Sequence, residues 1–211
     1  MALREHETQG ETSMKLRTLP MELSWKNNPL SSESRSEDSL IIVAGSETDW
    51  FSDPAGGPIR NNAPVAMFSA PDEDFVLSAK VSVGFNSTFD AGVLFLYENS
   101  THWAKLCLEY SPLNEAMIVS VVTRGRSDDC NSMSIEGHST YLRIYRQSNR
   151  LAFHQSEDGE YWHLVRHFTM GNLKNLRAGF SAQAPTGELC QAEFEEIRYQ
   201  KRRLTNIRNG E

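Results

Sequence analysis

Most apolar positions of the chain fall in short runs that are rich in β-branched and aromatic residues and end at Gly, Pro, Asn, Asp or Ser. Such runs predict β-strands separated by turns, and helical spacing of apolar residues is nearly absent. We therefore predict an all-β protein in which two antiparallel sheets pack face to face. The predicted strands cover residues 22–26, 39–44, 66–69, 76–85, 91–97, 103–110, 117–123, 141–146, 151–155, 161–168, 177–183 and 190–199.

The chain has 211 residues, which is enough for one sizeable core and too few for two full-sized domains. We expect one sandwich domain over residues 14–200, preceded by a polar, mobile extension over residues 1–13 and followed by a basic tail over residues 201–211. Within the domain, residues 46–64 are rich in Pro, Gly and Asn. This segment predicts a long ordered loop, an element that often carries binding residues.

Composition limits the choice of partners. The formal net charge is −7, from 21 Lys and Arg against 28 Asp and Glu. Nucleic-acid binding depends on neutralising phosphates, so we expect no nucleic-acid partner. The chain has no apolar run long enough for a signal peptide or a membrane span. We therefore expect a cytoplasmic protein without a membrane partner.

Three cysteines, Cys107, Cys130 and Cys190, are odd in number and widely spaced. They match neither a disulfide framework nor the close pairs of a zinc site, and reduced thiols agree with a cytoplasmic location. Asn86 and Asn99 each begin a glycosylation acceptor pattern, but that pattern is short and acts only on a secretory route. We do not expect either asparagine to be modified.

Alternation of side chains along residues 103–110 predicts one buried and one polar face. The even positions Ala104, Leu106 and Leu108 are apolar and predict a core face, whereas the odd positions include Lys105 and Glu109 and predict a solvated face. Joining this strand to residues 117–123 through a loop at 111–116 places Met117, Val119, Val121 and Thr123 beside the core face. Joining it backward to residues 91–97 through the loop at 98–101 places Asp90 on the solvated face, close to Glu109. Arg124 then approaches Trp103, and Lys105 supplies a neutralising charge beside the two carboxylates.

Other groupings of reactive residues do not complete a known site. His163 and His167 are four apart, but the surrounding residues alternate as in a strand, which holds them too far apart for one metal ion. Cys107 has no histidine that can be assigned as its base. We expect no metal and no cofactor. The only candidate for glycosidase chemistry is the pair Asp90 and Glu109, which would have to lie about 5 Å apart in a retaining enzyme.

Five ordered motifs resemble the DUF1349 family, also called the regulation-of-enolase family. The motifs are Thr48–Phe51, Asp90–Leu94, Trp103–Glu109, Ser120–Thr123 and Ser127–Cys130. The resemblance covers residues 14–199 and implies a concanavalin A-like β-sandwich, or jelly roll, of the lectin and glucanase type. Many members carry Ser-Asp-Trp-Ser where this chain has Ser127-Asp128-Asp129-Cys130, so one aromatic contact is missing and the edge is more acidic.

Three functions are compatible with this sequence. The first is a non-catalytic module that binds a carbohydrate or a related small metabolite on the concave sheet face, with Trp103 and either Trp50 or Phe51 as stacking platforms. The second is a regulatory protein that binds a metabolic enzyme such as enolase, as the family name suggests. The third is a weak glycoside hydrolase. The predicted ligand-binding residues are Asp49, Trp50, Asp90, Trp103, Lys105, Glu109, Arg124 and Asp128.

Overall fold

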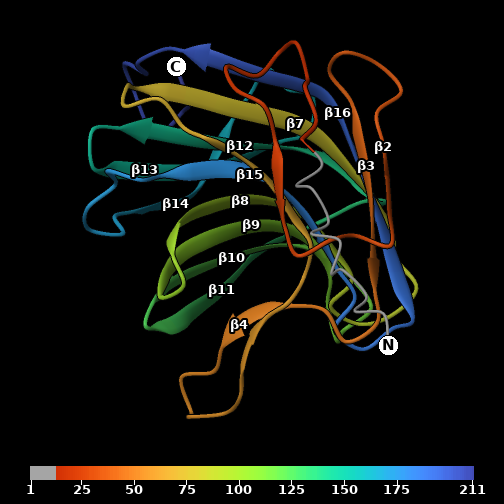
Figure 1. The fold of residues 1–211 in the computed structure, drawn as a ribbon. Helices are drawn as coiled ribbons and strands as arrows, with labels where there is room; N and C mark the ends of the chain where they lie inside the picture. The colour runs from red at the N-terminus through yellow and green to blue at the C-terminus, as the bar shows by residue number, and fades with distance from the viewer. Residues whose placement is uncertain (1–12) are drawn as a thin grey trace, which may run out of the picture.

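The computed structural model describes residues 13–211. Nearly all of the predicted extension over residues 1–13 lies outside the described residues. Residues 13–211 contain sixteen strands and no helix, and the all-β prediction is confirmed (Figure 1). The described part therefore has no helix that could span a membrane.

Two seven-stranded antiparallel sheets form the sandwich. Sheet I has the order β1 (Ser24–Lys26), β6 (Val65–Ser69), β15 (Arg177–Gln183), β8 (Ala91–Asn99), β9 (His102–Tyr110), β10 (Ala116–Arg124) and β11 (Arg126–Ile135). Sheet II has the order β14 (His163–Phe168), β13 (Arg150–Ser156), β12 (Ser139–Gln147), β7 (Phe75–Gly84), β16 (Leu189–Lys201), β3 (Leu40–Gly45) and β2 (Ser31–Glu33). A small separate ribbon pairs β4 (Trp50–Ser52) with β5 (Ile59–Asn61).

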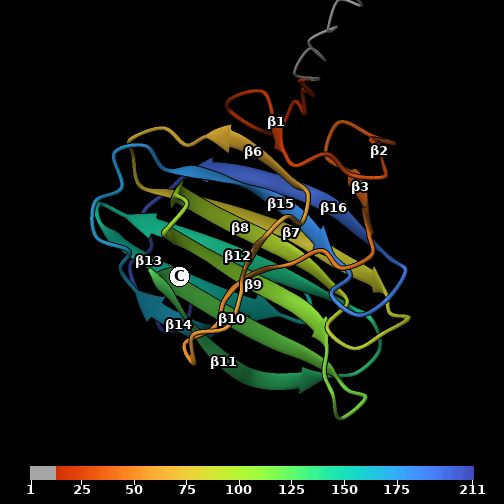
Figure 2. The same cartoon turned by 60° about the horizontal axis from the view of Figure 1, so that its bottom comes forward.

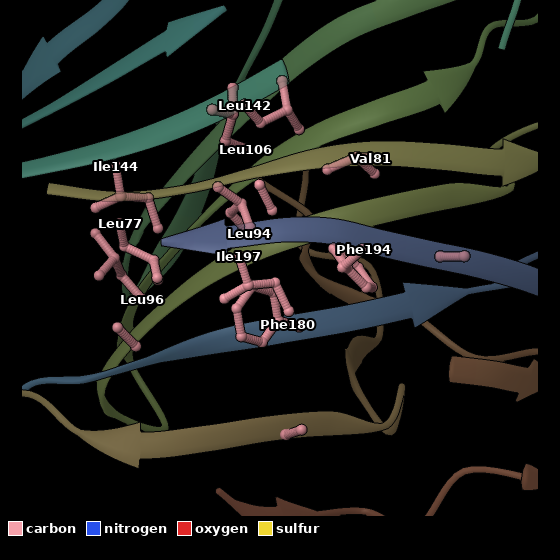
Figure 3. Packing of buried hydrophobic residues seen from close by; sticks show 14 of the residues in the cluster. Leu77, Val81, Leu94, Leu96, Leu106, Leu142, Ile144, Phe180, Phe194 and Ile197 are labelled. Atoms are coloured by element: carbon pink, nitrogen blue, oxygen red, sulfur yellow. The ribbon is translucent and has the colours of Figure 1, made fainter. Parts of the chain in front are cut away.

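The main core lies between the two sheets and is built from alternate positions of each strand. Leu94, Leu106 and Phe180 of sheet I meet Leu142 and Phe194 of sheet II (Figure 3). Burying such side chains is the dominant stabilising contribution in a sandwich of this kind. Ala104, Leu106 and Leu108 of β9 lie in this core, so the core face predicted from these residues is confirmed.

A second apolar cluster covers the outer face of sheet I. Trp50, Phe95, Trp103 and Cys107 belong to it, and Trp103 is only 2% exposed. The segment that carries β4 and β5 runs across this face in front of β8, β9 and β10 (Figure 2). The prediction of a solvated face at the odd positions of β9 is therefore wrong. Trp103 and Cys107 are buried because the long loop covers them, and the charged residues Lys105 and Glu109 are buried as well.

Strand register also differs from the prediction at both neighbours of β9. In β8, Ala91 pairs with Glu109 and Tyr97 with Trp103, with an irregularity between Tyr97 and Asn99. In β10, which begins at Ala116, Ala116 pairs with Tyr110 and Met117 pairs with Glu109. A slip of one residue moves every side chain to the opposite face of a strand. The odd positions of β8 and β10 therefore lie on the outer face, beside Lys105 and Glu109.

The basic C-terminal segment packs on the outer face of sheet II. Leu204 is 6% exposed and clusters with Tyr145 and Ala152. The backbone nitrogen of Leu204 donates to the Tyr145 hydroxyl at 3.1 Å, and His154 Nε2 donates to the Ile207 carbonyl at 2.8 Å. Residues 202–211 are thus part of the fold, although their arginines stay exposed.

Candidate functional site

A cavity of about 430 Å³ lies between the outer face of sheet I and the segment that crosses it. Its floor comes from four strands of sheet I, its roof from the ribbon of β4 and β5, and its rim from the turns before β8 and after β15. The lining residues are Lys105, Glu109, Val121, Asp129 and Gln183 on the floor, Asp49, Phe51, Asp53, Pro58 and Arg60 in the roof, and Phe89, Pro185 and Thr186 at the rim.

Lys105 is the central charged residue of the floor. Its ammonium nitrogen lies 3.0 Å from Oδ1 of Asp49 and 2.9 Å from Oε1 of Gln183. The Lys105 side chain is 4% exposed and that of Asp49 is 15% exposed. Burial acts to lower the pKa of Lys105, but the negative charge of Asp49 and the hydrogen bond to it outweigh burial and hold the pKa above its ordinary value. Lys105 therefore stays a cation.

Glu109 lies two rows further along β9 than Lys105. It pairs with Ala91 of β8, which in turn pairs with Gln183 of β15. Because Ala91 is small, the Gln183 side chain reaches across it, and its Nε2 lies 3.5 Å from Glu109 Oε2 and 3.1 Å from the Phe89 carbonyl. Burial raises the pKa of Glu109 to about 8, although Lys105 opposes the rise. At neutral pH this carboxyl is mostly protonated, so it can donate a hydrogen bond.

Asp129 stands at the exposed side of the cavity, on β11 next to Val121. Partial burial raises its pKa above the ordinary value, an effect that the charge of Lys105 opposes. The cavity therefore offers a fixed cation, a protonated carboxyl and an amide as polar groups. Phe51, Val121, Pro58 and Phe89 supply apolar walls.

The structure brings together Asp49, Lys105 and Glu109 among the eight predicted ligand-binding residues. Trp50 and Trp103 do not line the cavity and are buried in the second apolar cluster, with ring centroids 5.6 Å apart. Trp50 also donates from Nε1 to the Ala63 carbonyl at 2.9 Å. Neither indole can act as the exposed stacking platform that the sequence predicted, since the two rings cover each other.

Asp90 faces away from the cavity, and the prediction that it lies beside Glu109 is wrong. The backbone of Asp90 pairs with Tyr110, so its side chain points to the face opposite that of Glu109. One carboxylate oxygen accepts from the backbone nitrogens of Asn86 and Ser87 at 2.9 and 2.8 Å. Asp90 thus closes the turn before β8, which positions Phe89 at the rim.

Arg124 and Asp128 also lie outside the cavity. Arg124 is exposed at the end of β10, opposite His102. Asp128 forms an ion pair of 2.9 Å with Arg166 of β14, which links the edge strands of the two sheets. The next residue, Asp129, is the one that lines the cavity.

Two other sequence hypotheses concern thiol and metal chemistry. Cys107 is fully buried, and burial raises the pKa of its thiol well above the ordinary value, so the thiol stays protonated. His163 and His167 lie on strand β14, as the alternation predicted. Within residues 13–211, no group of three or more His, Cys, Asp or Glu side chains is placed to hold a metal ion.

Gln183, Phe89 and Asp129 are cavity residues that sequence reasoning did not select. Gln183 approaches Lys105 and Glu109 because β15 lies next to β8, a pairing of strands that are far apart in the chain. Phe89 adopts a left-handed backbone conformation with φ of 70°. Such a conformation is uncommon for a bulky residue and has no signal in the sequence.

Comparison with solved structures supports the fold. A functionally unknown protein from Saccharomyces cerevisiae has 21% identity and a TM-score of 0.79, covering 90% of this chain and 100% of its own. A mutant of the GH43 protein BlXynB from Bacillus licheniformis has 18% identity and a TM-score of 0.68, with 85% of this chain and 37% of that chain covered. Xylan beta-1,4-xylosidase from Bacillus halodurans has 14% identity and a TM-score of 0.64, with 80% and 33% covered.

The chain thus corresponds to about a third of each of these two glycoside hydrolase chains. A search of curated proteins found no match. The model of the family described as a protein of unknown function, DUF1349, matches residues 25–202. This match spans nearly all of the sandwich and confirms the resemblance on which the jelly-roll prediction rested. The chain belongs to the DUF1349 family.

Proposed function

We propose that this protein binds a small carbohydrate or a related polyhydroxylated metabolite, without transforming it, in the cavity between sheet I and the β4 and β5 ribbon. The observation that carries the proposal is the lining of that cavity, where a fixed hydrogen-bonding chain of Asp49, Lys105 and Gln183 lies among apolar walls. A volume of about 430 Å³ is typical of small-ligand sites, which combine apolar walls with a few convergent polar groups.

The polar groups match the hydroxyls of a sugar. A hydroxyl both donates and accepts, and the cavity presents donors at Lys105 and protonated Glu109 and acceptors at Asp49 and Asp129. The ring of Phe51 in the roof offers a surface against which the apolar face of a pyranose can pack. Similarity in fold to a xylosidase and to a GH43 protein makes pentoses and xylo-oligosaccharides reasonable first probes.

Binding without hydrolysis follows from the placement of the carboxyl groups. The Asp90 and Glu109 pair is excluded as catalytic machinery because Asp90 points to the opposite face of sheet I. Of the remaining carboxyls, Asp49 is held by Lys105, whereas Glu109 and Asp129 both have raised pKa values. The carboxyl pair that the sequence offered for retaining hydrolysis is therefore not assembled, and this supports binding without hydrolysis.

The experiment is a calorimetric titration with xylose, arabinose, xylobiose and xylotriose at pH 7. We expect saturable binding of at least one sugar, weakened at least tenfold in Phe51→Ala and in Asp129→Asn, both of which alter cavity side chains that carry little of the core. Tyr161→Ala is the matched aromatic control, since Tyr161 is 75% exposed and does not line the cavity.

Two results would contradict the proposal. Sugar binding that survives in both cavity variants would move the ligand to another surface. Hydrolysis of nitrophenyl xyloside or arabinoside that disappears in Glu109→Gln would make the protein an enzyme.

A further inference from the structure

A second concave surface lies on the opposite side of the molecule, between the C-terminal segment and β13 and β14. This groove has a volume of about 620 Å³. Its polar lining consists of Arg150, His167, Arg203, Gln147 and Thr205. We call it the basic groove, because the residues that line it include two arginines and a histidine and no carboxylate.

The cations of the basic groove are not neutralised by neighbours. Among the described residues, no Asp or Glu oxygen lies within ion-pair distance of Arg150 or Arg203. Two acidic residues of neighbouring segments, Asp74 and Glu211, form no ion pair with either arginine. Asp74 accepts from the Ser148 backbone at 2.9 Å, and Glu211 accepts from the Asn209 amide at 3.0 Å.

A buried arginine beneath the same segment adds to this positive charge. Tyr145, Ala152 and His167 form one cross-strand row. Arg143 lies two residues before Tyr145 on β12, so its side chain is on the same face in the next row. It is 3% exposed, and its Nε and Nη2 have no hydrogen-bond acceptor among the described residues. Its guanidinium stacks on Trp162 at 4.1 Å. Burial, together with the charge of Arg202, lowers the pKa of Arg143 to about 9.

The buried, unpaired charge of Arg143 is unfavourable, and an anion held nearby by the exposed arginines of the groove offsets part of that charge. We propose that the basic groove binds a phosphorylated small molecule, with Arg150 and Arg203 as the phosphate ligands. A phosphomonoester dianion suits two arginines because each guanidinium can present two parallel N–H groups to phosphate oxygens. Gln147 is placed to hydrogen-bond the rest of the molecule, and the Thr205 hydroxyl, which donates to the Glu211 backbone oxygen at 3.1 Å, can accept from it.

This groove is separate from the cavity on sheet I and faces away from it, since it lies on the outer side of sheet II. The two proposals can therefore fail independently. Overall charge does not decide the matter, because the net charge of −7 is distributed over the whole chain whereas binding depends on the local field.

The test uses the full chain and titrates it with glycerol 3-phosphate, glycerol and acetate at constant ionic strength, followed by NMR of backbone amides. We expect saturable shifts near Arg150, His167 and Thr205 with glycerol 3-phosphate and none with glycerol. The double variant Arg150→Gln, Arg203→Gln should weaken phosphate binding at least tenfold. The control Arg17→Gln, Arg35→Gln removes the same charge outside the groove, at two exposed residues that line neither site, and should leave the affinity unchanged.

Unchanged affinity in the Arg150 and Arg203 double variant would overturn the proposal, as would acetate binding as tightly as glycerol 3-phosphate. Equal losses in both double variants would show that net charge alone attracts the anion, which also contradicts a built site. All four arginines are exposed, so neither double variant should disturb the fold. The melting temperatures of both double variants should therefore match that of the wild type.

Discussion

The ammonium nitrogen of Lys105 on β9 lies 3.0 Å from a carboxylate oxygen of Asp49, which immediately precedes β4. This ion pair joins the floor of the cavity to its roof across 56 residues of chain. Both side chains are largely shielded from water, so their interaction is stronger than that of an exposed pair, and the loss of one partner leaves the other charge poorly solvated.

Asp49→Asn should therefore lower the free energy of unfolding by about 3 kcal/mol, because Lys105 remains as a buried charge. Lys105→Met should cost less, since the carboxylate of Asp49 is more exposed and can be hydrated. The double variant should be more stable than the sum of the two losses predicts. Urea denaturation of the four proteins measures this coupling, and strict additivity would show that the pair does not hold the roof.

Trp103→Ala should destabilise the fold by about 3–5 kcal/mol through a large cavity. The indole is 2% exposed and stacks on Phe95 with centroids 5.7 Å apart. Leu113→Ala is the control, because Leu113 is 76% exposed and its truncation should change stability by less than about 0.5 kcal/mol. Thermal and urea unfolding compare the two variants, and a fully stable Trp103→Ala protein would mean that the ribbon does not cover this face.

Glu109 should make the protein less stable as the pH rises. Its carboxyl ionises near the ordinary value of 4.5 in the unfolded chain and near pH 8 in the folded protein. Between these values the folded state keeps a proton that the unfolded state has lost, so each pH unit costs up to about 1.4 kcal/mol.

Glu109→Gln removes this titration. The free energy of unfolding of the variant, relative to that of the wild type, should increase from pH 4.5 to pH 8. Above pH 8 the difference between the two proteins should stay constant. Denaturant unfolding across pH 4 to 9 provides the measurement, and parallel curves for the two proteins would exclude a raised pKa at Glu109.

Local pattern was sufficient to predict the sandwich because most strands alternate between apolar and polar positions. It failed for β11, where positions Arg126–Ile135 are mostly exposed on both faces, as expected for a polar edge strand. Pattern also could not tell an outer face open to water from one covered by a loop. Trp50 covers Trp103 on the outer face of β9. The outward positions of that strand are therefore buried, although the sequence alternates between apolar and polar residues there.

The candidate site was predicted only in part, for reasons of register and strand order. Asp49, Lys105 and Glu109 were identified because charged residues stood among apolar ones in the motifs. Asp90 was placed on the wrong face because the irregularity near Tyr97 shifts the pairing of β8 by one residue. Gln183 was missed because nothing in the local sequence shows that β15 pairs with β8.

The central claim is that an uncharged sugar occupies the cavity beneath the β4 and β5 ribbon. NMR titration of the isotopically labelled protein with xylobiose and xylotriose tests it most directly, because each amide reports its own surroundings. We predict saturable shifts at the side-chain amide of Gln183 and the backbone amides of Phe51 and Phe89, with the second sheet unaffected. Shifts confined to sheet II, or no saturable shift with any sugar of the panel, would contradict the claim.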